Sequence, residues 1–375
     1  MKLADITPYF HQKSGGIRRY LLEKSAYLQK KGVEHVLVVP GKKRKTYYLN
    51  RTKVYEVPSF PIPLSGGYRF FNGFKEIREI IEQEKPHIVE LGGTYIPIDH
   101  FISPHYRLVV FYHSDIRTDL SLVPMPNKLR QKLIDYTVLK KLAKADLIIT
   151  PSSKQEDFLK GFGLEKVITV NLGVDTKTFS PSKRNPYIDS FLGVREGTYK
   201  LIYAGRLSPE KNIDLLLEVL DLLEPSTFHT VIVGDGSLRW KVERFAKRRM
   251  HITYLGYVQE SEKLAELYAS CDIFLSASSS ETYGLAFLEA QACGCILVAP
   301  DMDLESQPFK EFLVKEQKPE SFYEAIIKAV NSRSLSLRET ISSYIREHFS
   351  WEYTFERLMD VYSTLLECEP QATPS

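Results

Sequence analysis

The sequence predicts an α/β protein built from two doubly wound, Rossmann-like domains. Three observations lead to this fold class. The chain has 375 residues, which is more than a single hydrophobic core usually serves. Short apolar runs rich in Val, Ile and Leu alternate with longer stretches of helical periodicity. Within these runs the apolar residues are consecutive, which is typical of parallel strands covered by helices on both faces.

The expected strands form two series along the chain. The first comprises residues 2–7, 35–40, 54–59, 87–92, 108–113, 147–152 and 167–174, and the second comprises residues 200–207, 230–236, 252–258, 272–278 and 296–300. The polar, proline-containing segment "FSPSKRNPYIDS" separates the two series. We therefore expect one domain over residues 1–185 and another over residues 186–350. In such sheets ligands bind at the carboxyl ends of the strands, so the two domains are expected to face each other across a cleft.

Composition excludes several classes of protein. No run of 18 apolar residues occurs, and the N-terminus lacks the order of charged, apolar and small residues that marks a signal peptide. We expect a cytoplasmic protein with no nucleic-acid partner. The four cysteines, Cys271, Cys293, Cys295 and Cys368, lack the spacing of a zinc site. They are expected to be reduced thiols, and no metal is expected.

The charge differs between the two halves of the chain. Residues 1–180 contain 29 Lys and Arg against 18 Asp and Glu, whereas the remaining residues contain 21 against 29. Such an asymmetry arises either from solvated surface charge or from a first half that faces something anionic.

A glycine pair follows the first expected strand. Gly15 and Gly16 precede a stretch in which Ile17, Leu21 and Leu28 recur at helical spacing. Glycines let the backbone approach a ligand closely, and a helix N-terminus attracts a phosphate. An ordinary tight turn is the alternative.

Charged and polar residues follow three other expected strands. Arg206 and Lys211 flank a turn in "GRLSPEKN", where they can hold two cations over one diphosphate, and Pro209 fixes the bend. His113 ends the strand "LVVFYH" and is as often structural as chemical. Glu281 follows the strand "DIFLSAS", and Glu289 lies on the next expected helix.

Taken in this order, these motifs resemble the retaining nucleotide-sugar glycosyltransferases of the large family four, which have the two-domain B-type fold (GT-B). The resemblance rests on "SGGI", "YHSD", "ADLIITPSS", "NLGVDTKTFSP", "YAGRLSPEKN", "VIVGDG", "LGYV", "ETYGLAFLEAQACG" and "FSWEYTFERLMDVY". It implies an acceptor-binding first domain, a donor-binding second domain, and a C-terminal helix over residues 351–375 that crosses back to the first domain. The nucleotide sugar is a substrate, so no cofactor is expected.

The resemblance also implies roles for individual residues. Glu281 would lie beside the sugar and phosphate of the donor, and Glu289 would accept hydrogen bonds from the ribose hydroxyls. Arg206 and Lys211 would stabilise the leaving phosphate, and His113 completes the catalytic set. The remaining donor-binding residues would be Gly15, Gly16, Val258, Tyr283, Gly284 and Leu285.

The expected chemistry is metal-independent transfer with retention. The main demand is to stabilise charge on the departing phosphate, which side-chain cations and helix N-termini can meet. We expect the acceptor to attack from the face that the leaving group departs from. "DMD" at Asp301 to Asp303 mimics the metal motif of the other glycosyltransferase fold, but it follows the signature helix in a chain of different topology. The loop "APDMDLESQPF" is expected to be reshaped relative to the family.

The sequence does not determine the identity of the donor or of the acceptor. We expect a UDP-hexose first and GDP-mannose second. The stretch "HSDIRTDL" is similar to relatives that glycosylate membrane lipids, and the basic residues of "GKKRK", namely Lys42, Lys43, Arg44 and Lys45, precede the aromatic run "YRFFNGF". This favours a lipid or lipid-linked acceptor and peripheral attachment to the inner face of an anionic membrane. The alternatives are a soluble saccharide or metabolite acceptor, a phosphorylase or epimerase, and a catalytically silent nucleotide-sugar-binding subunit.

Overall fold

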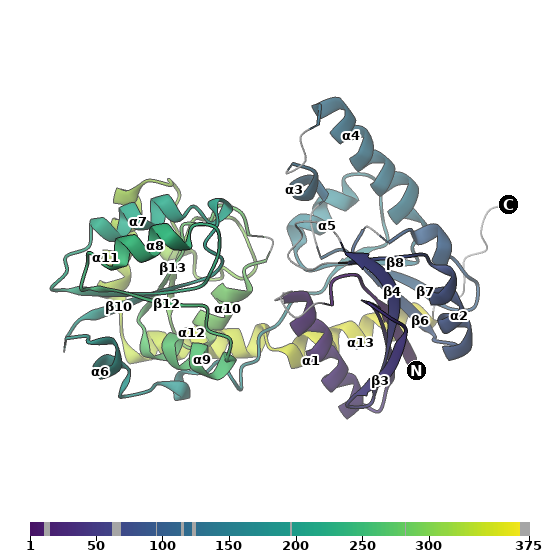
Figure 1. Cartoon of the computed structure of the whole chain (residues 1–375), viewed down its shortest axis with the longest axis horizontal. Coiled ribbons are helices and arrows are strands. Elements are labelled where there is room, and N and C mark those ends of the chain that lie inside the picture. The colour runs from purple at the N-terminus through teal and green to yellow at the C-terminus, as the bar shows by residue number, and fades with distance from the viewer. Residues whose placement is uncertain are drawn as a thin grey trace. The chain divides into compact units, whose positions relative to one another are not determined.

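The computed structural model describes residues 1–10, 16–61, 69–94, 96–113, 116–121, 125–195, 197–281 and 283–367. The chain divides into two compact units (Figure 1). Unit 1 contains residues 1–172 and 354–375, and unit 2 contains residues 173–353. Each unit is a mainly parallel sheet with helices packed against it, which confirms the predicted fold class.

The sheet of unit 1 has the order β3-β4-β2-β1-β6-β7-β8-β9, with β5 beside β4. Its strands are parallel except for β3 and β5, which run antiparallel to β4. The register is set around β1, where Ala4 lies between Val36 of β2 and Val89 of β6. The strands are β1 (Lys2–Ile6), β2 (Glu34–Gly41), β3 (Lys45–Leu49), β4 (Thr52–Pro61), β5 (Arg69–Phe71), β6 (Ile88–Gly92), β7 (Arg107–Phe111), β8 (Leu147–Thr150) and β9 (Val167–Thr169).

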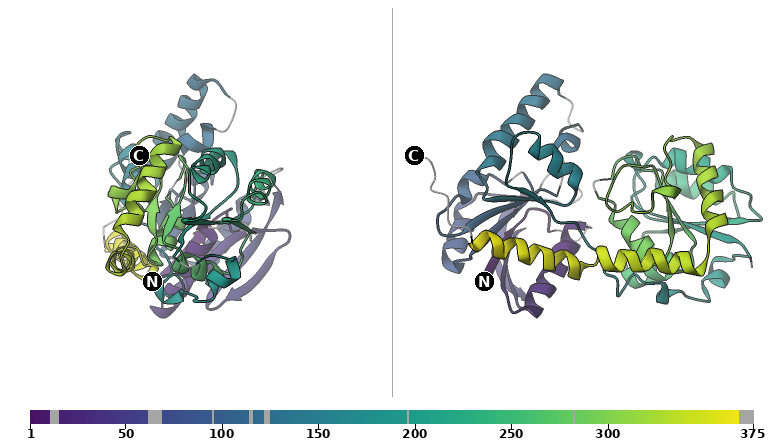
Figure 2. Two further views of the ribbon diagram at one scale, coloured as in Figure 1. Left: turned by 90° about the vertical axis from the view of Figure 1, so that its left-hand side faces the viewer. Right: turned by 180° about the vertical axis from the view of Figure 1, so that it is seen from behind.

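Helices cover both faces of this sheet. One face packs in a single apolar cluster with residues of α2, α4 and α5, among them Ile80, Ile134 and Leu159. On the other face α1 packs against α13, where Phe355 contacts the rings of Tyr20 and Tyr27 (Figure 2). The helices are α1 (Gly16–Lys30), α2 (Lys75–Glu84), η1 (Ile98–Phe101), α3 (Ile116–Ser121), α4 (Asn127–Tyr136), the π segment η2 (Thr137–Lys141), η3 (Leu142–Lys144), α5 (Ser153–Lys160) and α13 (Trp351–Glu367).

A buried ionic network attaches α13 to unit 1. The ammonium of Lys24 on α1 donates to Asp5 of β1 (2.8 Å), Glu90 of β6 (2.9 Å) and the hydroxyl of Tyr362 on α13 (3.1 Å). Tyr362 in turn donates to Glu90, and His35 bonds the second oxygen of Asp5 at 2.9 Å. All five side chains are buried. Because buried charges are costly unless paired, the network fixes how α1, α13 and the sheet fit together.

Unit 2 has a fully parallel sheet with the order β12-β11-β10-β13-β14. Its strands are β10 (Tyr199–Ala204), β11 (Phe228–Val233), β12 (Ile252–Gly256), β13 (Ile273–Leu275) and β14 (Ile296–Val298). Its helices are η4 (Pro181–Lys183), α6 (Ile188–Leu192), η5 (Pro209–Lys211), α7 (Ile213–Asp221), α8 (Arg239–Ala246), α9 (Ser261–Ser270), α10 (Leu285–Ala292), η6 (Lys310–Phe312), α11 (Pro319–Ser332) and α12 (Leu335–His348).

Residues 173–185, which the sequence analysis placed in the first domain, pack within unit 2. Asn185 donates its backbone N–H to Ser270 (3.1 Å), and Lys183 forms an ion pair with Glu262 (2.7 Å). Every expected strand range overlaps a strand, although β9 and β13 are shorter than the ranges 167–174 and 272–278, and β3 and β5 were not expected. No helix in the described part of the chain is long and apolar enough to span a bilayer.

Candidate active site

The predicted cationic turn and the first glutamate of the signature meet at one edge of unit 2. Strand β10 lies between β11 and β13, so the chain leaves β10 toward one side and returns on the other. Ligands bind at the carboxyl ends of the strands at such a switch point. Lys211, which follows β10, and Glu281, which follows β13, form an ion pair here at 2.5 Å. The structure thus joins two predicted residues that are 70 positions apart.

The turn after β10 leaves its other cation exposed. Pro209 begins the short helix η5, and Asn212 ends it with a positive φ of 51°. The Arg206 side chain is 73% exposed and lies 3.6 Å from Glu210, which is a weak surface contact. Tyr203 donates its hydroxyl to the Arg206 carbonyl at 2.9 Å and so holds the backbone. Arg206 is therefore free to turn toward an anionic ligand, whereas Lys211 is already paired.

Two glycines support this turn, and the sequence analysis assigned no role to them. A Cβ on Gly234 would lie 1.9 Å from the carbonyl oxygen of Gly205, and one on Gly236 would lie 2.3 Å from that of Leu207. The loop after β11 therefore packs directly beneath the turn after β10. The "GDG" in the quoted motif "VIVGDG" was the available signal, but only the structure shows which backbone the glycines approach.

The helix that carries the second signature glutamate begins directly after Gly284, whose backbone is left-handed. Gly284 has φ of 80°, and a Cβ there would lie 2.7 Å from the Phe287 ring and 2.9 Å from the Ser306 hydroxyl. Ser306 also donates to the carbonyl of Tyr283 and fixes the entry into α10. Glu289 is buried on α10. Leu285 is the first residue of this helix, so its N–H is among those with no acceptor inside the helix.

The other residues predicted to bind the donor, Val258, Gly15 and Gly16, do not belong to the turn after β10 or to α10. Val258 is half-buried in the loop after β12, a strand at the edge of the unit 2 sheet. Gly16 is the first residue of α1 in unit 1. Gly15 lies outside the described residues.

His113 lies where three strands of unit 1 end. It follows β7, its ring packs edge-on against Tyr9 after β1 with centroids 4.8 Å apart, and Gly93 after β6 faces both rings. A Cβ on Gly93, whose φ is 96°, would lie 2.8 Å from the Tyr9 ring and 3.1 Å from Nε2 of His113. The ring is therefore held on two sides.

The imidazole of His113 is held neutral. Burial lowers the pKa of His113 to about 4, against the opposing effect of a hydrogen bond to the Gly92 backbone. The Nε2 atom is buried and has no hydrogen-bond partner in the described structure. In the neutral tautomer this nitrogen can accept a hydrogen bond from a hydroxyl group.

The "DMD" aspartates form ion pairs with a lysine. Lys310 lies 3.4 Å from Asp301 and 3.0 Å from Asp303. Across the ranges that the structure describes, no group of three His, Cys, Asp or Glu side chains could hold a metal ion. Cys271, Cys293 and Cys295 are buried and form no disulfide, and Cys368 lies outside the described residues.

The basic residues of the predicted membrane contact lie on the turn between β2 and β3 and at the first position of β3. Arg44 is paired with Glu76 at 3.2 Å, and the Lys45 ammonium lies over the Tyr47 ring at 5.0 Å. Lys42 and Lys43 are exposed on the connecting turn. Two of the four cations thus already have partners.

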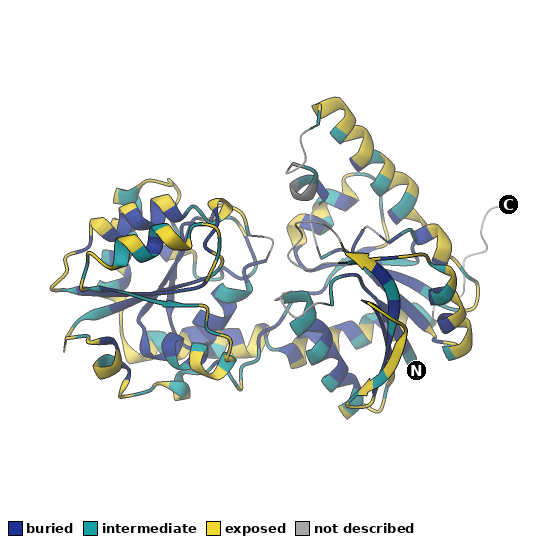
Figure 3. Cartoon of the chain, viewed as in Figure 1, coloured by how far each residue is buried: buried dark blue, intermediate teal, exposed yellow. Residues whose placement is uncertain are grey.

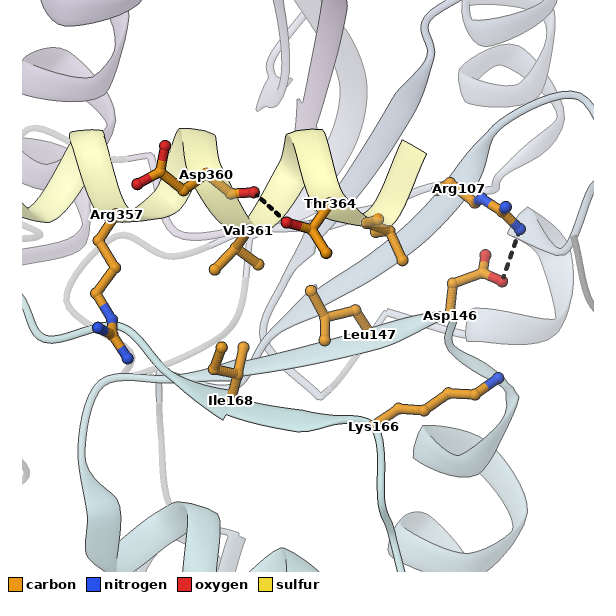
Figure 4. A pocket seen from close by; sticks show the side chains of 10 residues that line it. Arg107, Asp146, Leu147, Lys166, Ile168, Arg357, Asp360, Val361 and Thr364 are labelled. Atoms are coloured by element: carbon orange, nitrogen blue, oxygen red, sulfur yellow. Dashed lines mark hydrogen bonds and ion pairs between the residues drawn. The ribbon is translucent and has the colours of Figure 1, made fainter. Parts of the chain in front are cut away.

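A cavity of about 550 Å³ contains none of the predicted site residues (Figure 4). It lies between α13 and the beginnings of β7, β8 and β9, opposite the end that carries His113. Leu147, Ile168 and Val361 supply apolar walls, and Arg107 pairs with Asp146 at 3.9 Å on its rim.

Comparison with known proteins gives a consistent result over both units. The family model "Glycosyltransferase Family 4" matches residues 14–178, and "Glycosyl transferases group 1" matches residues 187–348. The chain is 26% identical over 364 residues to the "GDP-mannose-dependent alpha-(1-6)-phosphatidylinositol dimannoside mannosyltransferase" of Mycobacterium tuberculosis, covering 94% of this chain and 93% of the relative. It is 24% identical over 387 residues to a component of the phosphatidylinositol N-acetylglucosaminyltransferase of Arabidopsis thaliana, covering 98% of this chain and 83% of the relative. Among solved structures, sucrose-phosphate synthase from Thermosynechococcus elongatus superimposes with a TM-score of 0.78 at 16% identity, covering 97% of this chain and 99% of that chain.

Proposed function

Because the chain belongs to the group 1, family 4 glycosyltransferases with the GT-B fold, we propose that it transfers a hexosyl unit from a nucleotide sugar to a lipid or lipid-linked acceptor with retention. The observation that carries this proposal is the arrangement at the switch point of unit 2. There an exposed arginine, a paired lysine and a signature glutamate gather beside β10 and β13.

The donor diphosphate is proposed to bind at this edge. Arg206 is available at once, and Lys211 becomes available when the diphosphate competes with Glu281 for its ammonium. The first N–H groups of α10, at Leu285, add partial positive charge. These donors stabilise the charge that develops on the β-phosphate, for which removal of a single donor typically costs about 10²–10³ in rate. No metal is required in this scheme.

The two signature glutamates are proposed to bind different parts of the donor. Glu289, on the helix that begins at Gly284, accepts hydrogen bonds from the vicinal ribose hydroxyls, for which a carboxylate is well suited. Glu281, released from Lys211, lies beside the sugar. Val258 and the glycine pair Gly15 and Gly16 complete the proposed donor contacts.

His113 is proposed to accept a hydrogen bond from a sugar hydroxyl through Nε2. Its lowered pKa of about 4 keeps the ring neutral at physiological pH, and its packing against Tyr9 fixes the direction of the lone pair. A charged imidazolium could not accept this bond.

The proposed mechanism places a single carboxylate near the sugar. Retaining glycosidases use two, one as nucleophile and one as acid. Here the bond between the anomeric carbon and the phosphate oxygen breaks while the acceptor oxygen attacks from the same face. The acceptor proton passes to the departing β-phosphate, and a nucleoside diphosphate is released. In this scheme no atom of the protein becomes part of the product.

The relatives bear on the identity of donor and acceptor. The names of the two relatives above specify phosphatidylinositol-based acceptors, which supports a lipid acceptor. The first of them is GDP-mannose-dependent, and this moves our preference from a UDP-hexose to GDP-mannose. A soluble saccharide acceptor is the second candidate. Lys42, Lys43, Arg44 and Lys45 remain proposed contacts with the membrane or the acceptor.

Two measurements test the proposal. Thermal unfolding is followed with a panel of UDP-, GDP- and ADP-sugars. A ligand at 100 times its Kd stabilises the native state by about 2.7 kcal/mol, and Arg206→Ala serves as the control that should lose the shift. The stabilising donor is then incubated with phosphatidylinositol or diacylglycerol in detergent, with and without inorganic phosphate, and the anomeric configuration of the product is determined by NMR.

The expected result is transfer to lipid with retention and no dependence on phosphate. Formation of a sugar phosphate would instead indicate a phosphorylase. If a nucleotide sugar stabilises the protein but no transfer occurs to any lipid or saccharide acceptor, a catalytically silent nucleotide-sugar-binding protein becomes the better interpretation.

A further inference from the structure

Helix α4 presents an apolar stripe to solvent. Leu129, Leu133 and Tyr136 are 49%, 38% and 54% exposed, and their spacing of four and three residues places them on one face of the helix. Leu139 in the following π segment is also exposed. Figure 3 shows exposed positions along α4 where the helix projects from the body of unit 1. Isolated exposed apolar residues are common, but a continuous stripe marks an interaction site.

The stripe is not a core face that has been left uncovered. The helical segment is anchored through a different set of side chains, Ile134 of α4, Val138 of η2 and Leu142 of η3, which are buried in the apolar cluster of unit 1. Arg130 adds a hydrogen bond to the carbonyl of Leu120 in α3. One set of apolar residues thus serves folding, whereas Leu129, Leu133 and Tyr136 do not pack in this cluster. The Tyr136 ring is contacted by the Lys141 ammonium, 5.5 Å from its centroid.

Basic residues surround the stripe. The segment 127–141 contains five cations against the single acid Asp135, and Gln131 donates to that carboxylate at 2.8 Å. In the described part of the chain, Lys128, Lys132 and Lys140 are exposed and form no ion pair. An apolar stripe flanked by lysines is complementary to an anionic lipid surface, where the apolar side chains enter the interface and the cations meet phosphate groups.

We propose that α4 docks unit 1 onto anionic membranes through Leu129, Leu133 and Tyr136, with Lys128, Lys132 and Lys140 as its electrostatic contacts. The inference rests on the proposed lipid acceptor and names the surface that would bring the enzyme to it. His113 ends β7, and α3, which packs against α4, begins three residues later. A bilayer on the stripe would thus lie beside the strand edge where the acceptor is proposed to bind.

The helix is better suited to this role than the turn between β2 and β3. That turn keeps only Lys42 and Lys43 without a partner, because Arg44 is paired with Glu76. Each basic residue near an anionic surface strengthens binding about fivefold. Three unpaired cations with three apolar side chains on α4 and the adjoining η2 therefore outweigh two cations on a turn.

Co-sedimentation with vesicles tests the proposal. The intact protein is mixed with vesicles of 30% phosphatidylglycerol in phosphatidylcholine, or of phosphatidylcholine alone, at 50 and 500 mM NaCl. Two helix variants are compared. The apolar variant combines Leu129→Gln, Leu133→Gln and Tyr136→Gln. The lysine variant combines Lys128→Glu, Lys132→Glu and Lys140→Glu.

Two control variants have matched changes elsewhere. Tyr187→Gln with Phe191→Gln removes apolar side chains that are 77% and 72% exposed in unit 2. Lys42→Glu with Lys43→Glu reverses the charge of the competing turn. Circular dichroism checks that each variant is folded. If the apolar helix variant does not fold, the lysine variant still tests whether α4 binds the vesicles.

We expect wild-type binding to the anionic vesicles that falls at least tenfold at high salt or in either helix variant. The Tyr187 and Phe191 variant should bind within twofold of wild type, and the Lys42 and Lys43 variant should lose less binding than either helix variant. Unchanged binding of the helix variants, or a loss confined to the Lys42 and Lys43 variant, would overturn the proposal. So would a concentration-dependent dimer, detected by ultracentrifugation, that the helix variants abolish, since a second copy would then cover the stripe.

A separate assay distinguishes failure of this inference from failure of the proposed function. Transfer to a lipid acceptor in detergent should be the same in the helix variants and the wild type, because no bilayer is involved. Wild-type protein that binds vesicles but transfers no sugar would refute the function alone. Transfer in detergent without any vesicle binding would refute the docking surface alone.

Discussion

Replacing Lys24 by methionine is expected to destabilise unit 1 by about 3–5 kcal/mol, the usual cost of removing one member of a buried ion pair. The Lys24 ammonium is fully buried and lies within 3.1 Å of oxygens on Asp5, Glu90 and Tyr362. Methionine fills a similar volume, so the loss is electrostatic. Two carboxylates would remain buried without their cation, and the contact that joins α13 to the sheet would weaken.

The assay is thermal unfolding of the intact chain by calorimetry. For a unit of this size 1 kcal/mol corresponds to about 2–4 °C, so the unit 1 transition should fall by roughly 6–20 °C. Lys30→Met on the same helix is the control, because Lys30 is exposed. A loss below about 1 kcal/mol, or an equal loss in the control, would refute the role assigned to the network.

The pH dependence gives a second check with a defined sign. In the native network, burial acts to raise the pKa of Asp5, but the contacts with Lys24 and His35 outweigh it, so this pKa is lowered. Burial raises the pKa of Glu90. Without Lys24 the folded-state pKa of both carboxyls should rise above the unfolded value. The folded variant then takes up protons before the unfolded chain does, so its deficit should shrink as pH falls from 8 to 5. A deficit that grows in this range would contradict the argument.

Other predictions concern the proposed site. Arg206→Ala and Lys211→Ala should each reduce turnover by about 10²–10³; Arg206→Ala should leave the unfolding temperature unchanged, whereas Lys211→Ala should lower it because Glu281 loses its partner, and near-wild-type turnover would remove the residue from the site. Glu289→Ala should chiefly raise KM for the donor, whereas Glu281→Ala should chiefly lower kcat; equal effects on both constants in both variants would contradict this division. Gly234→Ala should reduce donor affinity by displacing the turn beneath which it packs, and unchanged binding would show that the turn tolerates the shift. Activity should persist in EDTA, and a loss that Mn²⁺ or Mg²⁺ restores would return the aspartate motif to consideration.

The sequence predicts those features that depend on local patterns. Consecutive apolar runs correctly locate the parallel strands of both sheets, because a strand buried on both faces has a distinctive composition. Parallel strands place their carboxyl ends at one edge, so the order of motifs also predicts which residues share that edge. The family resemblance assigned Lys211 and Glu281 to one ligand, and the two side chains form an ion pair.

The sequence does not predict features that depend on contacts across the fold. Strand β3 is short, half-exposed and preceded by a basic turn, so no apolar run marks it. Lys24 has the appearance of an ordinary surface lysine of an amphipathic helix, and its burial becomes evident only when Asp5 and Glu90 come from two neighbouring strands. The need for glycine at position 234 likewise arises from a contact with the backbone of Gly205, which lies 29 residues earlier in the chain.

The ion pair at the proposed donor site implies an exchange of partners during donor binding, which the sequence motifs do not reveal. Lys211 and Glu281 are each about four-fifths buried, so neither can be left without a partner at little cost. A diphosphate that takes Lys211 must therefore release Glu281 at the moment when the sugar of the donor arrives to occupy it. Under this scheme a nucleoside diphosphate without sugar satisfies the lysine but leaves the glutamate unpaired, whereas the intact donor satisfies both. Under the proposed function, the exchange would favour the complete donor over its product and would help to release the nucleoside diphosphate after transfer, while the exposed Arg206 would bind both species alike.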